Sequence, residues 1–207
     1  MLVDVADEDV DRARIVEGLG SAGAAVADIV LDPSASIQEL PASFMRRARL
    51  FEVEKFRPTR PTLVYIGLAQ DGAAFLLNQR PDQFHLMVAH AGAQLDGPAD
   101  AVELARTFVH VTRPQNRRYL LVASVDELPW MPGLEGDAAK RADEQRHALT
   151  KILVPPGASP KTDGWDVDLF VVDGNSLDRL IVHVRKSGRM ETECERLFDE
   201  LSLAYAL

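Results

Sequence analysis

The sequence predicts an α+β fold: an antiparallel β-sheet, made of a hairpin plus a C-terminal meander, with helices packed mainly on one face. Three observations lead to this prediction. Two apolar runs flank Asp71-Gly72, residues 165–185 alternate between apolar and polar side chains, and residues 98–112 carry apolar side chains at helical spacing. A period of two is typical of a half-buried strand, whereas recurrence at i, i+3, i+4 and i+7 is typical of an amphipathic helix.

The predicted hairpin has its two arms at residues 62–68 and 74–78. An Asp-Gly turn between apolar runs is a strong short-range hairpin signal, because glycine accepts the positive φ that tight turns need. Pro58 and Pro61 lie just before the first arm, and proline disfavours regular strand pairing. We therefore expect two parts, a helical or mixed α/β segment over residues 1–60 and an α+β main domain over residues 61–207.

Two helices and one strand are expected between the hairpin and the meander. Pro98 and Asp100 are typical of a helix start, and Pro114 ends that helix. A second helix is predicted over residues 137–153, before Pro155-Pro156. Residues 119–125 are apolar on both faces, which predicts a central strand. Residues 84–89 fit either a strand or a helix.

The meander is the clearest pattern in the chain. Asp166 and Asp168 fall on its polar face, where Arg179, His183 or Arg185 of the next strand can pair with them. A terminal helix is expected after it, because Thr192 and Glu195 fit a capping box and an apolar stripe follows, formed by Cys194, Leu197, Phe198, Leu201 and Tyr205. Over residues 98–193 the order of elements resembles the curved-sheet folds of the cystatin and NTF2-like type, and this resemblance in order implies no particular function.

Composition narrows the function classes. The chain has 207 residues and a formal net charge of −9, which disfavours general binding to the nucleic-acid backbone. Its one cysteine excludes an internal disulfide and any multi-cysteine metal site. No apolar run reaches the roughly 18–20 residues of a membrane span, and the acidic start is unlike a signal peptide. We expect a soluble cytoplasmic protein that uses no cofactor or metal and binds neither nucleic acid nor membrane.

One motif matches a dinucleotide-binding fingerprint. Gly18-Leu19-Gly20-Ser21-Ala22-Gly23 has the spacing G-x-G-x-x-G, which in that family of sites brings backbone close to a pyrophosphate. A dinucleotide-binding fingerprint requires a strand directly before the glycines. Residues 14–16 would have to form this strand, which would be very short. The favoured alternative is a helix over residues 8–19 that ends at the glycines, followed by a short strand or second helix over residues 24–31.

Six residues are candidates for binding a ligand or partner. Arginines bind carboxylates and other anions bidentately, and a Trp held between prolines is typical of a binding hot spot. The alternatives are that the arginines offset a helix dipole and pair with surplus acids, and that the Trp closes the end of a core. The candidates are Arg106, His110, Arg113, Arg117, Arg118 and Trp130.

Two functional hypotheses follow, and a third is less favoured. The sequence has no Gly-x-Ser-x-Gly elbow, phosphate loop or His-Glu-x-x-His. The preferred hypothesis is therefore a non-catalytic interaction or accessory module, which binds a protein partner or associates with itself as a homodimer. The alternative is a small-molecule-binding protein or enzyme with a pocket between curved sheet and helices, lined by His110, Asp126 and Trp130. Dinucleotide binding through Gly18–Gly23 is the third.

Overall fold

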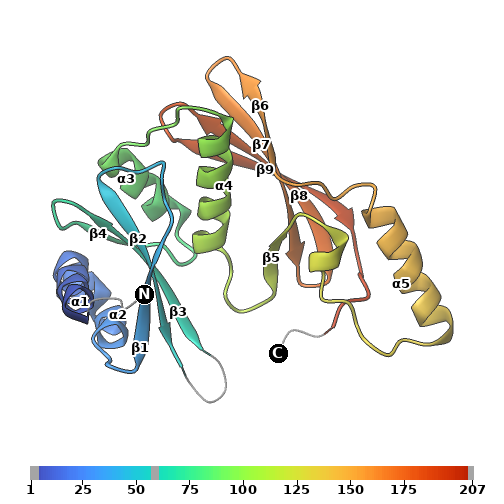
Figure 1. Ribbon diagram of the computed structural model, residues 1–207, viewed down its shortest axis with the longest axis horizontal. Coiled ribbons are helices and arrows are strands. Elements are labelled where there is room, and N and C mark those ends of the chain that lie inside the picture. Colours follow the sequence, from blue (N-terminus) through green and yellow to red (C-terminus); the bar gives the residue numbers. More distant parts are fainter. Residues whose placement is uncertain (1–4, 57–60, 205–207) are drawn as a thin grey trace. The chain divides into compact units, whose positions relative to one another are not determined.

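The computed structural model describes residues 5–56 and 61–204 and has an α+β fold with two antiparallel sheets (Figure 1). The chain divides into two compact units. Unit 1 comprises Met1–Leu95 and Ser187–Arg189, and unit 2 comprises Asp96–Lys186 and Met190–Leu207. The boundary expected near residue 60 falls inside unit 1, between two strands that pair with each other.

Unit 1 begins with two helices, α1 (Val5–Leu19) and α2 (Ala24–Val30), joined by a 3-10 turn at Gly20–Gly23. The segment before the glycines is thus a helix, so the strand that a dinucleotide fingerprint requires at residues 14–16 is wrong. Gly18 also has no open space for a ligand, since a Cβ built there would lie 2.2 Å from the carbonyl oxygen of Gly72. The two later glycines of the motif follow the end of a helix, and Gly18 packs against the turn at Gly72.

The sheet of unit 1 has the order β1-β2-β3-β4. Its strands are β1 (Ala35–Leu40), β2 (Ala48–Lys55), β3 (Thr62–Ala69) and β4 (Ala74–Leu76), and the β3–β4 pairing confirms the predicted hairpin. Helix α3 (Pro81–Ala91) settles the ambiguous run at residues 84–89 as helix.

Helices lie on both faces of this sheet, whereas the sequence predicts helices packed mainly on one face. Ile15 of α1 and Val30 of α2 share a core with Val64 and Ile66 of β3. Gly67, which points to the opposite face, lies under α3, where a Cβ would meet Met87 Sδ at 2.0 Å. The reason is that β3 is apolar on both faces, so each face needs a cover.

The turn at residues 187–189 also belongs to unit 1, although it is distant in sequence. Gly188 has φ +81° and packs so closely that a Cβ there would lie 2.6 Å from side-chain carbons of both Val88 and Ala93. Glycine is needed here for the backbone angle and for the close approach.

Unit 2 starts with α4 (Pro98–Thr112), whose predicted start is confirmed. The Asp100 carboxylate accepts hydrogen bonds from the backbone N–H groups of Asp96 (2.7 Å) and Gly97 (3.1 Å), satisfying donors before the first turn. The predicted stripe is buried at Ala101, Leu104, Ala105, Phe108 and Val111. The remaining elements before the meander are β5 (Tyr119–Val122), a 3-10 turn at Val125–Glu127 and α5 (Gly136–Leu149).

The second sheet has the order β5-β7-β8-β9, and β6 also pairs with β7. Its long strands are β7 (Gly164–Asp173), β8 (Ser176–Arg185) and β9 (Met190–Phe198), while β6 is short (Gly157–Lys161). β5 pairs with residues 170–173 of β7 and β6 pairs with residues 164–168, so both lie along the same edge of β7.

Two expectations for this unit are wrong. Residues 119–122 form an edge strand rather than a central one, since β5 pairs with β7 alone among the described strands. Residues 190–198 form strand β9 rather than a terminal helix, because pairing with β8 from Met190–Val184 to Phe198–Leu177 overrides the helical spacing of the apolar residues. As a result, Cys194 is exposed, whereas a helix stripe would have buried it.

Candidate interaction surface

The arginine cluster expected from the sequence is dispersed into separate local contacts. Arg113 Nη1 lies 3.0 Å from His110 Nδ1, one turn back along α4. Arg117 Nε lies 2.6 Å from Asp173 Oδ1 at the end of β7. Arg118 binds the carbonyl of Ala204 and lies 3.4 Å from Asn175 Oδ1. These contacts tie the end of α4 and the start of β5 to neighbouring segments, and Arg106 is exposed on α4.

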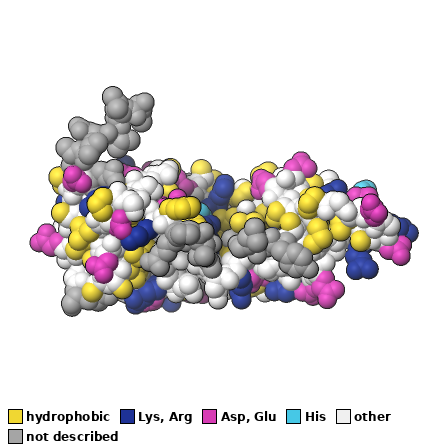
Figure 2. All heavy atoms as spheres, turned by 90° about the horizontal axis from the view of Figure 1, so that it is seen from below, with side chains coloured by type: hydrophobic (Ala, Val, Ile, Leu, Met, Phe, Trp, Pro, Cys, Tyr) yellow, Lys and Arg dark blue, Asp and Glu magenta, His cyan; other side chains and the backbone are white. Residues whose placement is uncertain are grey.

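Charges of both signs are interspersed on the surface. Figure 2 shows Lys and Arg side chains among Asp and Glu side chains over the face in view, without a large block of one sign. This distribution suits local pairing better than long-range attraction of an anion.

Trp130 is half-buried and packs against the core of unit 2, beside Leu128, Leu149 and Leu203 among others. Its indole Nε1–H donates to the carbonyl oxygen of Val125 at 3.1 Å. The guanidinium carbon of Arg146 lies over the ring, 4.9 Å from its centroid. The ring therefore contacts the core, a backbone carbonyl and a cation at once, an arrangement suited to closing a core.

The meander carries a polar face with the predicted cross-strand pairs. His183 Nδ1 lies 2.8 Å from Asp166 Oδ1, and Arg179 Nη2 lies 2.6 Å from Asp168 Oδ1. Lys161 Nζ from β6 lies 2.9 Å from the other oxygen of Asp166. The hydrogen bond with Asp166 raises the pKa of His183 above its ordinary value of 6.5. Burial opposes ionisation of Asp166, but the bonds from His183 and Lys161 outweigh it and lower the pKa of that carboxyl.

A pocket of about 320 Å³ lies at the end of this face, beside the β6–β7 turn. Trp165 is half-buried and forms part of its wall. The polar groups that line it are Lys161, Asp163, Asp166, His183 and Arg185. Most of these groups already pair with one another or with β9, so the charges that line the pocket are nearly balanced.

Strand β9 forms one edge of the sheet of unit 2 and is largely exposed. β9 has nine residues, of which the six from Glu191 to Arg196 are exposed. Of the strands that lie at a sheet edge in the described chain, β9 is the longest, since β1, β4, β5 and β6 have three to six residues. An edge strand presents backbone N–H and C=O groups that no neighbouring strand pairs.

Three carboxylates line one face of β9. Glu191, Glu193 and Glu195 alternate along the strand and lie on the same face as the cation-bearing side of β8. Their partners are Arg185 at 3.3 Å, His183 at 3.4 Å and Arg179 at 3.9 Å, and the three glutamates keep side-chain exposures of 53%, 72% and 62%. Exposed pairs at these distances contribute only about 0–1 kcal/mol each. The carboxylates therefore retain acceptor capacity toward a second cation.

One ion pair between a buried carboxylate and an exposed guanidinium fastens β9 to β8 on the other face. Asp178 is 5% exposed and accepts a hydrogen bond from the Arg196 guanidinium. That bond raises the pKa of Arg196 further above its ordinary range. β9 is thus firmly held on its inner side while its outer side is open.

Sequence reasoning missed β9 because the apolar positions from Cys194 to Leu201 happen to match helical spacing. The signal that could have found it is the alternation of Glu191, Glu193 and Glu195 directly after the Ser187-Gly188 turn, which continues the period of two from β8. The six candidate residues named from the sequence all lie outside β9. Among them, His110 and Arg113 contact each other.

No helix among residues 5–56 and 61–204 is long and apolar enough to cross a membrane. Within the same ranges no three His, Cys, Asp or Glu side chains converge in a way that could hold a metal ion.

Comparison of the chain with models of protein families, with curated proteins and with solved structures gave no match.

Proposed function

We propose that the protein is a non-catalytic interaction module, and that unit 2 binds an extended, basic segment of a partner protein along β9. The observation that carries this proposal is the nine-residue edge strand with six consecutive exposed residues and three aligned carboxylates. Addition of a strand to a sheet edge is a common mode of peptide recognition, in which backbone hydrogen bonds supply affinity and alternate side chains supply specificity.

The charge pattern of β9 selects the partner. In a sheet, residues directly opposite each other point to the same face, so an added strand places alternate side chains beside Glu191, Glu193 and Glu195. Lys or Arg at every second position complements them. The residues between face Thr192 and Cys194, which are small, so small or apolar side chains fit there.

The same pattern disfavours pairing of β9 with itself. In a symmetric antiparallel pair, a two-fold axis perpendicular to the sheet relates the two copies of β9. The same face of each strand then lies on the same side of the sheet, so each residue lies opposite residues from that same face. Any such register sets the glutamates of one copy beside those of the other, and like charges placed opposite each other are destabilising. The edge therefore favours a basic strand over a second copy of β9.

The experiment uses two synthetic heptapeptides, Lys-Val-Lys-Val-Lys-Val-Lys and Glu-Val-Glu-Val-Glu-Val-Glu, each with a fluorophore. We expect the full chain to bind the basic peptide with an affinity that falls as salt rises, and to ignore the acidic one. Hydrogen exchange should slow at backbone amides of residues 191–196 when the basic peptide is present.

A matched pair of triple variants separates this site from general attraction to an acidic protein. Glu191→Gln/Glu193→Gln/Glu195→Gln removes three charges from β9, and Glu135→Gln/Asp137→Asn/Asp143→Asn removes three from exposed positions on and before α5. The first set should weaken binding about tenfold, and the second should leave it nearly unchanged. Equal effects of both sets, or unchanged exchange in β9, would refute the proposal.

A small-molecule site is the second candidate, favoured by the pocket of about 320 Å³ at the β6–β7 turn. A thermal-shift screen against nucleotides, dinucleotides and small zwitterionic metabolites tests it, because a ligand at 100 times its Kd adds about 2.7 kcal/mol of stability. A stabilising compound whose effect disappears in His183→Gln supports this candidate, and one that acts equally on both proteins does not.

A further inference from the structure

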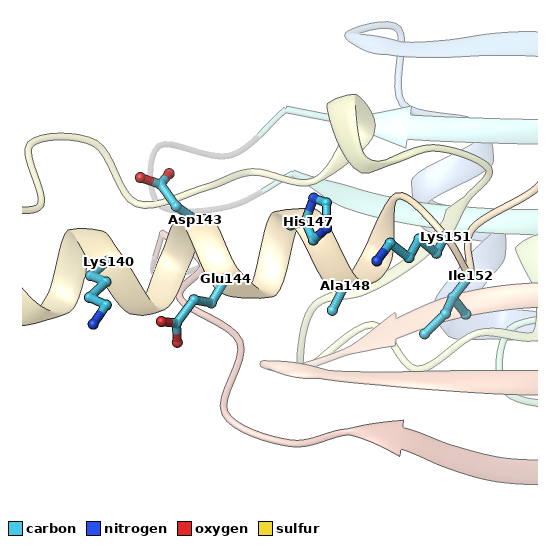
Figure 3. Close-up of a pocket in the computed structure, with 7 residues that line it drawn as sticks. All are labelled: Lys140, Asp143, Glu144, His147, Ala148, Lys151 and Ile152. Atoms are coloured by element: carbon cyan, nitrogen blue, oxygen red, sulfur yellow. The ribbon is translucent and has the colours of Figure 1, made fainter.

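The outer side of α5 and the turn after it form a second uncovered surface in unit 2. An open groove of about 900 Å³ runs along it. Figure 3 shows the side chains that line the groove spread along the helix, with Asp143 and His147 on one side of the helix axis and Glu144 and Ala148 on the other. The lining residues are Lys140, Asp143, Glu144, His147, Ala148, Lys151 and Ile152.

This groove lies opposite the face by which α5 is attached. Ala142 and Leu149 are buried, and they lie seven residues apart, close to two helical turns. Glu144 is rotated from Ala142 by about 200° around the helix axis, and Lys151, in the turn after the helix, lines the same groove. They therefore mark the centre of the outward face.

The charges along the groove are ordered. Lys140 comes first, about one turn before the acidic pair Asp143 and Glu144, and His147 and Lys151 follow that pair one and two turns later. If two such helices lay parallel, Glu144 would meet Glu144 and Lys151 would meet Lys151. If they lay antiparallel about a two-fold axis between positions 147 and 148, Glu144 of each copy would face Lys151 of the other.

The centre of that arrangement suits close packing. Ala148 would face His147 of the second copy, and a small side chain at the crossing allows helix axes to approach to about 8–10 Å. Ile152, half-buried, and Val154, 52% exposed, would lose solvent contact near the two ends of the contact. Lys140 would lie opposite position 155 of the second copy, beyond its α5 helix and the turn after it. Lys140 therefore does not contribute to the charge pairing between the two copies.

We propose that two copies of this chain associate antiparallel through the outer faces of their α5 helices. The partner is a second copy because Glu144 of each copy faces Lys151 of the other when the direction is reversed. This contact is separate from β9 and leaves that edge open for a partner strand.

The test is the oligomeric state of the full chain, measured by sedimentation velocity from about 1 to about 300 μM, a range that brackets the micromolar affinities of small interfaces. We expect a monomer–dimer equilibrium that shifts toward monomer as salt rises. Lys151→Glu places two repulsive pairs in the dimer and should raise its Kd at least about tenfold. Glu144→Lys should act in the same direction.

The double variant Glu144→Lys/Lys151→Glu restores complementarity with the signs exchanged, so it should recover the dimer. Lys186→Glu, at an exposed position outside α5, makes the same change in net charge as Lys151→Glu and should leave the equilibrium unaltered. A wild-type chain that stays monomeric throughout the range overturns the proposal. A dimer whose Kd is unchanged by Lys151→Glu also overturns the proposal. So does a double variant whose dimer Kd stays as high as that of the single variants.

Discussion

Trp130 offers the sharpest test of how unit 2 is held together. The change Trp130→Ala removes three contacts of known kind. Loss of a half-buried indole costs about 2 kcal/mol, since full burial corresponds to about 3–5 kcal/mol. The hydrogen bond to Val125 adds about 1 kcal/mol, and the Arg146 contact adds about 0.5 kcal/mol at an exposed site. We therefore expect the free energy of unfolding to fall by about 3 kcal/mol.

Urea denaturation followed by tryptophan fluorescence measures this loss. The chain has two tryptophans, Trp130 and Trp165, both in unit 2, so the signal of Trp165 reports on that unit after Trp130 is removed. With an m value of about 2 kcal/mol/M the midpoint should fall by about 1.5 M. Trp130→Phe keeps the ring contacts and loses the N–H donor, so it should cost about 1 kcal/mol.

A loss below about 0.5 kcal/mol for Trp130→Ala, together with weaker partner binding, would refute the reasoning. Trp130 would then be a binding hot spot, and its core contacts would be incidental.

Three further predictions concern the meander. His183 has a pKa raised above 6.5 in the folded chain, so its contribution to stability is complete below about pH 6.5 and is lost as pH rises through the folded value. The stability difference between wild type and His183→Gln should thus shrink from pH 6 toward pH 9 in urea titrations, where a difference that grows with pH would be contradictory. Gly164→Ala should lower the free energy of unfolding by more than about 2 kcal/mol, because φ is +149° and a Cβ would lie 1.9 Å from the carbonyl oxygen of Val184. Thermal melting tests this, with Gly157→Ala, which meets no atom within 4 Å, as the control. Cys194 should react with a maleimide in the folded chain, and because burial raises the pKa of its thiol the rate should rise about tenfold per pH unit around neutrality; labelling only after unfolding would place the thiol in the core.

Short-range patterns predicted the fold well where local chemistry and pairing agree. The Asp71-Gly72 hairpin, the start of α4 at Pro98 and the Asp166–His183 pair all follow from neighbours in sequence or from alternation across one turn. Residues 190–198 failed because two periods fit the same residues, and only pairing with β8 decides between them.

The candidate site was harder to predict because it, too, depends on which strands pair with each other. An edge strand is defined by what does not pair with it, and that is a property of the whole sheet. Arg117 and Arg118 are adjacent in sequence, which suggested a cluster, but in the bend before β5 Arg117 pairs with Asp173 and Arg118 contacts Asn175. For Trp130 the sequence leaves two roles open, and its contacts with Val125 and Arg146 favour the core role.

The turn at residues 187–189 has a consequence for cleavage of the chain. Since this turn belongs to unit 1 while its flanking strands belong to unit 2, the polypeptide passes between the units three times. A protease that cuts between Leu95 and Asp96 therefore leaves a C-terminal fragment that still carries Gly188, packed beside Val88 and Ala93 of the N-terminal fragment. The two fragments should co-elute after such a cut and separate only in denaturant. Expressed alone, residues 1–95 would lack a piece of their own fold.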